Sequence, residues 1–243
     1  MIALLKKEIN SFLNSVIGYM VIIVFLMSVG LFMWVFPGDS NILDNGFANI
    51  DTLFVIAPFI FMFLVPAVTM RSFAEEYRQG TIELLLTKPL TEMQVVLAKY
   101  LANVVLVLFS LLPTLVFVYS VYHLGAPAGN IDMGGTWGSY LGLFFLSAGF
   151  ASIGIFASSL TNNQITAFII GVFLSFFFYT GFQSVSTLPI FSGIDYLILS
   201  LGIQEHYISM SRGVIDTRDM IYFLSIIVLF LLLTKTSLES RKW

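Results

Sequence analysis

The chain has 243 residues, of which 58% are hydrophobic and only 10% are charged, and its mean hydropathy is +0.95. A soluble domain of this length carries about 25% charged residues and cannot bury this much apolar surface, so a soluble globular protein is excluded. There are no cysteines, which excludes disulfides, thiolate metal ligands and cysteine nucleophiles. We therefore predict an all-α, polytopic membrane protein.

Residues 1–15 have an amphipathic pattern and do not resemble a cleavable signal peptide. Charged residues at 6–8 interrupt the segment, and the apolar run after it is too long for a signal sequence. Apolar residues recur at helical spacing, at Leu5, Ile9, Phe12 and Val16. This pattern predicts a helix lying flat in the cytoplasmic interface. It serves either as a simple anchor or as an elbow that transmits force into the first span.

Six stretches are apolar and long enough to cross a bilayer, which takes about 20 residues. They are Val16–Phe36, Thr52–Met70, Val95–Tyr122, Trp137–Leu160, Gln164–Phe182 and Met220–Thr234. Pro58, Pro66 and Pro113 lie inside spans, where we expect kinks whose freed carbonyls are satisfied by neighbouring helices. The fourth span has small residues in steps of three and four, at Gly138, Gly142, Ser147, Ala151, Gly154 and Ser158. This spacing is typical of close helix packing, which we expect within one subunit rather than between two.

Positive charge is concentrated on one side of this six-span arrangement. That side has Lys6, Lys7, Arg71, Arg78, Lys88, Lys99, Lys235, Arg241 and Lys242, whereas the other has only Arg212 and Arg218. Because cytoplasmic segments carry the excess of Lys and Arg, we predict that both termini are cytoplasmic and that the chain lies in the inner membrane of the cell.

The middle of each predicted span lacks Asp, Glu, Arg and His, which an ion-coupled carrier would need for a relay. Lys99 and Lys235 lie near span ends, where we expect their ammonium groups to reach the interface. Asn103 is expected to form an interhelical hydrogen bond. The sequence has no phosphate-binding loop, and neither histidine has a metal-ligand neighbour at helical spacing. We predict no catalytic residue, metal or other cofactor, and membrane lipid rather than nucleic acid as a partner.

The inner connection, residues 71–94, carries the most information. Its first twenty residues are RSFAEEYRQGTIELLLTKPL, and both Ser72–Glu75 and Thr91–Gln94 have capping-box spacing. Gly80 is expected to end one helix and Thr81 to begin another, which Pro89 stops. The charges on this segment predict either a rigid helical hairpin that binds a partner protein or a solvated connector.

Residues 71–90 resemble the cytoplasmic coupling segment of ABC-2 type permeases, the membrane subunits of a class of ABC transporters. The core of the likeness is E-E-Y-R-x-G-T-x-E-L-L-L-T at 75–87. A second stretch, G-V-I-D-x-R-D-x-x-Y-F at 213–223, resembles the segment that leads into the last span of that family. Within the family, the chain is most similar to permeases of gliding-motility ABC transporters.

The resemblance implies that a separate ATPase subunit docks on the inner connection, at Glu75, Glu76, Tyr77, Arg78, Gly80, Thr81 and Glu83. It also implies an extracytoplasmic helical hairpin at 183–219 that caps the translocation path, with His206, Arg212, Gly213, Asp216, Arg218 and Asp219 as its candidate residues. Gly202 divides the apolar part of this segment, so we expect two short helices there.

The same resemblance implies an ATP-driven exporter with two ATPase subunits, a second permease that is identical or paralogous, and an auxiliary gliding-motility subunit. The residues leave two alternatives open. One is a membrane scaffold of a motility or secretion machine, and the other is an ion-coupled carrier. The sequence does not identify the cargo.

Overall fold

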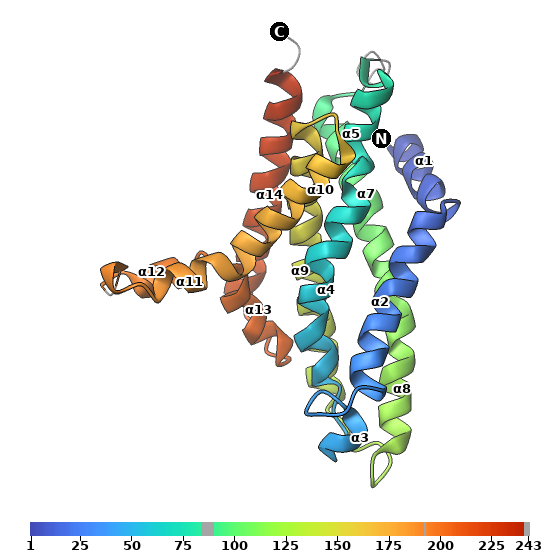
Figure 1. The fold of residues 1–243 in the computed structure, drawn as a ribbon, viewed down its shortest axis with the longest axis vertical. Helices are drawn as coiled ribbons and strands as arrows, with labels where there is room; N and C mark the ends of the chain where they lie inside the picture. The colour runs from blue at the N-terminus through green and yellow to red at the C-terminus, as the bar shows by residue number, and fades with distance from the viewer. Residues whose placement is uncertain (84–89, 192, 241–243) are drawn as a thin grey trace.

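The computed structural model describes residues 1–83, 90–191 and 193–240, and this part of the chain is a bundle of long helices without a strand (Figure 1). Five helices are long and apolar enough to cross a membrane: Asp51–Gln79, Glu92–Leu124, Met133–Leu160, Gln164–Ser186 and Thr217–Ser240. A bent pair, α1 (Ile2–Leu13) and α2 (Val16–Trp34), adds a sixth if it counts as one span. These findings confirm the predicted all-α, polytopic fold.

Several long helices change winding along their length. The second span consists of α4 (Asp51–Thr69) and α5 (Arg71–Gln79). The third consists of α7 (Glu92–Leu111), the 3-10 turn η1 (Leu112–Thr114) and α8 (Leu115–Leu124). The fifth consists of α10 (Gln164–Phe176), the π-helix η2 (Phe177–Gly181) and α11 (Phe182–Ser186). Pro113 lies in the 3-10 turn η1, where the absence of a backbone N–H in proline is tolerated.

The remaining elements of the described chain are two long helices and several short ones. They are α3 (Ile42–Asn45), α9 (Met133–Leu160), η3 (Pro189–Phe191), α12 (Asp195–Leu199), α13 (Ile203–Ser211) and α14 (Thr217–Ser240). α11 and α12 project sideways from the bundle, and α13 returns to pack on α9 and α14 (Figure 1). Gly202 precedes α13, so the two short helices predicted on either side of it are confirmed.

One of the two predicted capping boxes is present. Thr91 Oγ1 accepts a hydrogen bond from the Gln94 backbone N–H at 3.3 Å, and Gln94 Oε1 accepts from the Thr91 N–H at 3.2 Å, so α7 begins as expected. The prediction for Ser72 is wrong. α4 continues into α5 almost without interruption, so Ser72 lies within helix and its hydroxyl contacts Asn103 instead.

Pro58 lies inside α4 at a point where another helix supplies the missing donor. Because proline has no N–H, the carbonyl of Phe54, four residues earlier, has no partner within α4. The hydroxyl of Tyr207 on α13 donates to this carbonyl at 2.6 Å. Burial raises the pKa of Tyr207 well above its ordinary value, so the hydroxyl keeps its proton. This contact confirms that a neighbouring helix satisfies a carbonyl freed by proline.

α9 lies at the centre of the bundle. Within the apolar window of this helix 78% of residues are buried, against 22% for Gln164–Ser186, and α4, α10, α13 and α14 all pack against it. Glycines allow this closeness: a Cβ at Gly142 would approach Met210 to 2.6 Å, and one at Gly154 would overlap Thr69. The small residues therefore serve packing within the subunit, as predicted.

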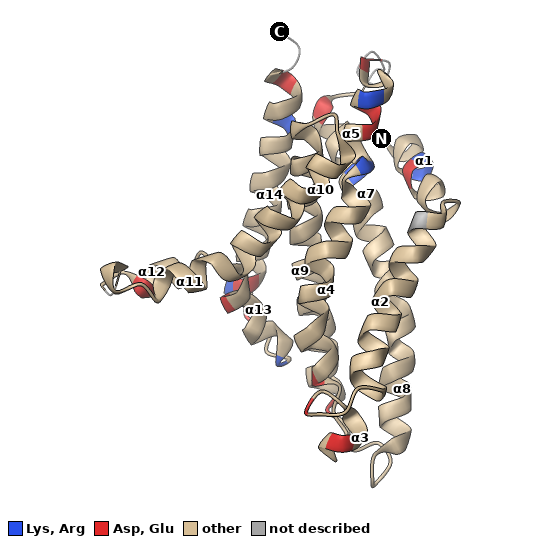
Figure 2. Ribbon diagram, in the orientation of Figure 1, with Lys and Arg blue, Asp and Glu red and all other residues tan. Residues whose placement is uncertain are grey.

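Charged residues collect at the two ends of the bundle, and a further group lies on α12, on α13 and at the start of α14 (Figure 2). The N-terminus and the described end of α14 lie at the same end, together with α1 and α5, while α3 and the loop before α9 lie at the opposite end (Figure 1). Both termini therefore lie on one side of any membrane that the bundle spans. We refer below to the end with the termini as the basic end.

Candidate functional site

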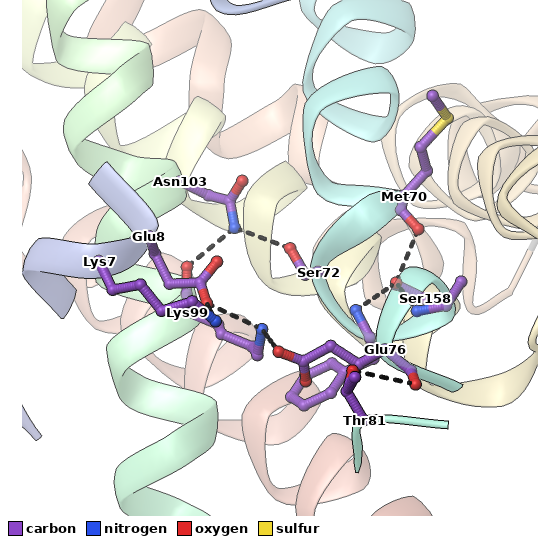
Figure 3. Close-up of polar contacts among 11 residues, drawn as sticks. Lys7, Glu8, Met70, Ser72, Glu76, Thr81, Lys99, Asn103 and Ser158 are labelled. Atoms are coloured by element: carbon purple, nitrogen blue, oxygen red, sulfur yellow. Dashed lines mark hydrogen bonds and ion pairs between the residues drawn. The ribbon is translucent and has the colours of Figure 1, made fainter. Parts of the chain in front are cut away.

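The candidate site is centred on α5 at the basic end. There, α9 forms hydrogen bonds with the junction between α4 and α5. Ser158 Oγ on α9 accepts hydrogen bonds from the backbone N–H groups of Phe73 at 3.0 Å and Ala74 at 3.1 Å. It also donates to the Met70 carbonyl at 2.9 Å. The turn at Met70 interrupts the helical hydrogen bonds, so this one buried hydroxyl replaces the acceptor that the two N–H groups have lost (Figure 3).

A buried lysine connects α5 to two other helices. Lys99 Nζ on α7 lies 3.0 Å from Glu76 Oε1 on α5 and 3.2 Å from Glu8 Oε1 on α1 (Figure 3). Its ammonium group also lies 5.3 Å from the centre of the Phe73 ring. We call Lys99, Glu8 and Glu76 the ion cluster.

Our prediction that Lys99 reaches the interface is wrong. Only 2% of its side chain is exposed, against 40% for Lys235, which pairs with Glu239 at 3.4 Å. α1 and α5 cover Lys99, so its charge is compensated by carboxylates rather than by water. A charge this deep is tolerated only when partners lie at such distances.

Asn103 provides a second link between α7 and α5. Its amide Nδ2 donates to Ser72 Oγ at 3.1 Å and to the Lys99 carbonyl at 2.8 Å, and the residue is only 1% exposed. The predicted interhelical hydrogen bond is confirmed. Through Ser158, Asn103 and Lys99, α5 is therefore attached to α9, α7 and α1.

The helix α1 meets α2 at an elbow with an angle of 61°. Leu4 and Phe12 of α1 are buried, and Phe12 packs with Val68 and Leu106. The structure differs from our prediction at Val16, which begins α2 and is 75% exposed. α1 ends at Leu13 and the backbone is extended at Ser15, so the apolar face of α1 does not continue to Val16.

The residues predicted to dock an ATPase face in different directions. Arg78, Gly80 and Glu83 are exposed, and Glu75 is half-buried with its carboxylate accepting from Gln79 Nε2 at 3.1 Å. Glu76 points inward to Lys99, as described above. Tyr77 packs against the core, and Thr81 Oγ1 donates to the Glu76 carbonyl at 3.4 Å.

Gly80 ends α5 as predicted. Its φ of +68° lies in the left-handed region, which favours glycine. Ile82 and Glu83 are helical. The rest of the predicted second helix falls on residues 84–89, which lie outside the described part of the chain.

The structure brings together two of the candidate residues in 183–219. His206 Nδ1 on α13 lies 2.7 Å from Asp219 Oδ1 on α14, and His206 Nε2 lies 2.9 Å from the Ser200 carbonyl. Both ring nitrogens thus lie within hydrogen-bond distance of an oxygen atom. The imidazole stacks on Tyr222 with ring centres 3.8 Å apart. These contacts fasten α13 to the start of α14.

Of the other four candidates, Arg212, Gly213 and Asp216 lie in the connection between α13 and α14, and Arg218 lies in the first turn of α14. Arg212 caps α13, Gly213 has a φ of +80° and packs against Gly135, and the carboxylate of Asp216 accepts from the Arg218 N–H at 2.9 Å. Arg212, Asp216 and Arg218 are exposed. They do not join His206 and Asp219 in a single cluster.

Sequence reasoning missed Ser158 and the ion cluster as parts of the site. One signal was available for the cluster: Lys99 is the only cation in an otherwise apolar helix, and carboxylates occur in both segments predicted at its cytoplasmic end. Ser158 belonged to the stripe of small residues, and its hydroxyl gave no separate signal.

A bundle of spanning helices with a polar helix fastened to one end defines a polytopic membrane subunit. Residues 36–234 match a family model described as ABC-2 family transporter protein. The chain therefore belongs to the ABC-2 family, and it is a permease subunit of an ABC transporter. This family is a membrane component that works with ABC ATPase subunits and is not itself catalytic. A comparison with curated proteins gave no match.

Proposed function

We propose that residues 71–94 are the segment through which separate ATPase subunits drive this permease. The observation that carries the proposal is the attachment of α5 to α9 by Ser158, to α7 by Asn103 and Lys99, and to α1 through Glu8. Packed helices move as bodies rather than deforming continuously. A displacement of α5 would therefore reach three other helices without passing through a flexible linker.

The contact with the ATPase would be made by the outward residues of this segment. Arg78 and Glu83 are exposed on either side of the turn at Gly80, so their charges are free for charge-assisted contacts. Glu76 has a different role in this proposal, since it holds Lys99 inside the subunit. The ATPase must bind two conformations of the permease with different affinity, or hydrolysis would move nothing.

The complete transporter would contain two ATPase subunits and a second permease, identical or paralogous to this chain, in the inner membrane. The outer segment 183–219 would cap the path, and the His206–Asp219 contact would hold that cap on α14. The likeness of the whole chain to gliding-motility permeases, and to GldF in particular, supports an exporter of that type with an auxiliary motility subunit.

The test is co-purification of the full chain with the ATPase encoded beside it. Replacing Arg78 and Glu83 together (Arg78→Glu, Glu83→Lys) should weaken the complex about tenfold, because charge-assisted contacts across the interface are reversed. Glu239→Lys is the matched control, as it reverses an exposed charge on α14 at the same end. An intact complex with an unchanged ATPase rate would show that the segment does not couple.

A scaffold gives a different result in the same experiment. A membrane anchor would retain the ATPase, but hydrolysis would respond neither to the permease nor to changes in α5. A transporter should instead lose stimulation of hydrolysis when Ser158 is replaced by alanine, while Ser159→Ala should have no effect. Ser159 is buried on the same helix, and its hydroxyl bonds only to the Phe156 carbonyl of α9.

A further inference from the structure

A polar cavity of about 390 Å³ lies between α1 and α5 at the basic end. Its lining includes three cations, Lys7, Arg71 and Lys99, and three carboxylates, Glu8, Glu75 and Glu76. The volume is within the range of about 300–1,000 Å³ that is typical of small-molecule sites and far exceeds the space for one bridging water. Formal charges around the cavity cancel.

Two polar atoms of these lining residues are buried without a hydrogen-bond partner among residues 1–83, 90–191 and 193–240, and they are of opposite kinds. Arg71 Nε is a donor, and the nearest carboxylate oxygen, on Glu75, is 3.9 Å away and too far for a hydrogen bond. Glu76 Oε2 is an acceptor, since only the other oxygen of this carboxylate contacts Lys99. Buried polar groups are rarely left unpaired, so the pair calls for a ligand with both an acceptor and a donor.

The charge pattern selects among headgroups. A purely anionic phosphate has no N–H to donate to Glu76 Oε2, and the three carboxylates of the lining offset the attraction of its three cations. A quaternary ammonium has no N–H to donate to Glu76 Oε2. A zwitterion with a phosphate and a primary ammonium meets both demands, because the phosphate accepts from Arg71 and the ammonium donates to Glu76.

The surroundings of the cavity favour a lipid as the source of this headgroup. Phe12 lines the cavity and packs with Val68 and Leu106, and these two residues also line a narrow apolar groove between α2, α4 and α7. Val16 and Tyr19, just past the elbow, are exposed apolar residues. The polar cavity therefore adjoins apolar surface, as a bilayer interface places a headgroup next to its chains.

We propose that this cavity binds the headgroup of a phospholipid with a primary amine, of the phosphatidylethanolamine class, between the elbow helix and α5. Arg71 contacts the phosphate, and Glu76 contacts the ammonium. The bound lipid then links α1 to α5 beside the ion cluster. This inference does not depend on which ATPase or cargo the permease serves.

The test uses the full chain in nanodiscs of phosphatidylcholine alone, or with phosphatidylethanolamine or phosphatidylglycerol added, and native mass spectrometry to count retained lipids. Phosphatidylethanolamine should be retained and should raise the thermal midpoint, whereas phosphatidylglycerol should do neither. Arg71→Gln should weaken this retention about tenfold, because it removes a charge-assisted contact. Arg78→Gln, an exposed change on the same helix, should retain the lipid as the natural chain does.

Two results would overturn the proposal. Equal retention of all three lipids by the natural chain would mean that the cavity does not select a primary-amine headgroup, and this comparison needs no variant. Glycerophosphoethanolamine, which has the headgroup without acyl chains, should fail to raise the midpoint at matched concentration. A shift equal to that of the lipid would identify a soluble ligand in place of a phospholipid.

Discussion

Lys99 is held by carboxylates that lie 91 and 23 residues away in the chain. The ion cluster has a formal charge of −1, and Glu8 and Glu76 are 13% and 14% exposed, so water at the adjoining cavity reaches the carboxylates but hardly the ammonium. Such a cluster contributes less to stability than its distances suggest, because desolvation offsets attraction. Its loss would nevertheless be costly, since the unpaired carboxylates would face one another.

Replacing Lys99 by methionine should therefore destabilise the protein. Removing one member of a buried ion pair lowers the free energy of unfolding by about 3–5 kcal/mol. Because the carboxylates are partly exposed, we expect a loss of about 3 kcal/mol here. For a domain of this size, that is a fall in thermal midpoint of about 6–12 °C in detergent. Adding Glu8→Gln and Glu76→Gln to Lys99→Met should recover most of the loss. An unchanged midpoint for the single variant would contradict the burial of the charge.

The hydrogen bond from Tyr207 to the Phe54 carbonyl makes a prediction about two residues at once. Tyr207→Phe should cost about 1–3 kcal/mol, because it leaves a buried carbonyl without a donor. With Pro58→Ala in the background, residue 58 regains an N–H for the same carbonyl, so the cost of Tyr207→Phe should nearly vanish. A double-mutant cycle of thermal midpoints measures this coupling. Additive effects would mean that the hydroxyl does not replace the missing proline N–H.

At the scale of elements, α9 organises the bundle through its small residues. Gly138, Gly142 and Gly154 each lie where another segment approaches closely: the connection after α13, α13 itself and α4, respectively. Without a hydrophobic force between helices in lipid, such contacts depend on van der Waals packing. The same helix carries Ser158, so the position of α5 depends on how closely α9 approaches α4.

Gly154→Ala should separate α9 from α4 and destabilise the bundle by about 1–3 kcal/mol, because the new methyl group would overlap Thr69. Gly149→Ala is the control within the same helix, where the nearest atom to an added Cβ is Phe223 Cδ1 at 3.8 Å. This control should be neutral or slightly stabilising, since alanine favours a helix. Similar thermal midpoints for the two variants would argue against close contact at Gly154.

At the scale of the whole molecule, the distribution of charge and the shared end of the termini predict the topology. α1, α5 and the end of α14 lie at the basic end, while Asn130 lies in the connection between α8 and α9. Placing the basic end in the cytoplasm follows the excess of Lys and Arg there. Asn130 would then face the opposite side.

The absence of natural cysteines makes this topology directly testable. A membrane-impermeant maleimide should label Asn130→Cys in intact cells, because this exposed residue would lie outside the cytoplasm in the proposed topology. Lys6→Cys and Ser240→Cys should be labelled only after permeabilisation. Labelling of Lys6→Cys in intact cells would reverse the orientation and the proposed position of the ATPase.

Several features could be predicted from the sequence because they depend on neighbouring residues. Apolar runs of sufficient length predicted the five long spans at approximately their observed bounds, and the sixth corresponds to the bent pair of α1 and α2 if that pair counts as one span. Thr91 caps α7 as its capping box predicted. Gly80 ends α5 for a similarly local reason. The capping-box spacing at Ser72 is the same as that at Thr91, but at Ser72 a helix already extends from α4.

The sequence by itself determined that this protein is a helical membrane protein, since hydropathy and helical spacing are properties of contiguous segments. Only the tertiary structure decided that Lys99 is buried between Glu8 and Glu76. The same is true of the hydrogen bond from the start of α5 to Ser158 and of the hydrogen bond from Tyr207 to the Phe54 carbonyl. These contacts join segments distant in the chain. Their energies depend on which polar groups meet once water is excluded, and that is fixed by helix packing.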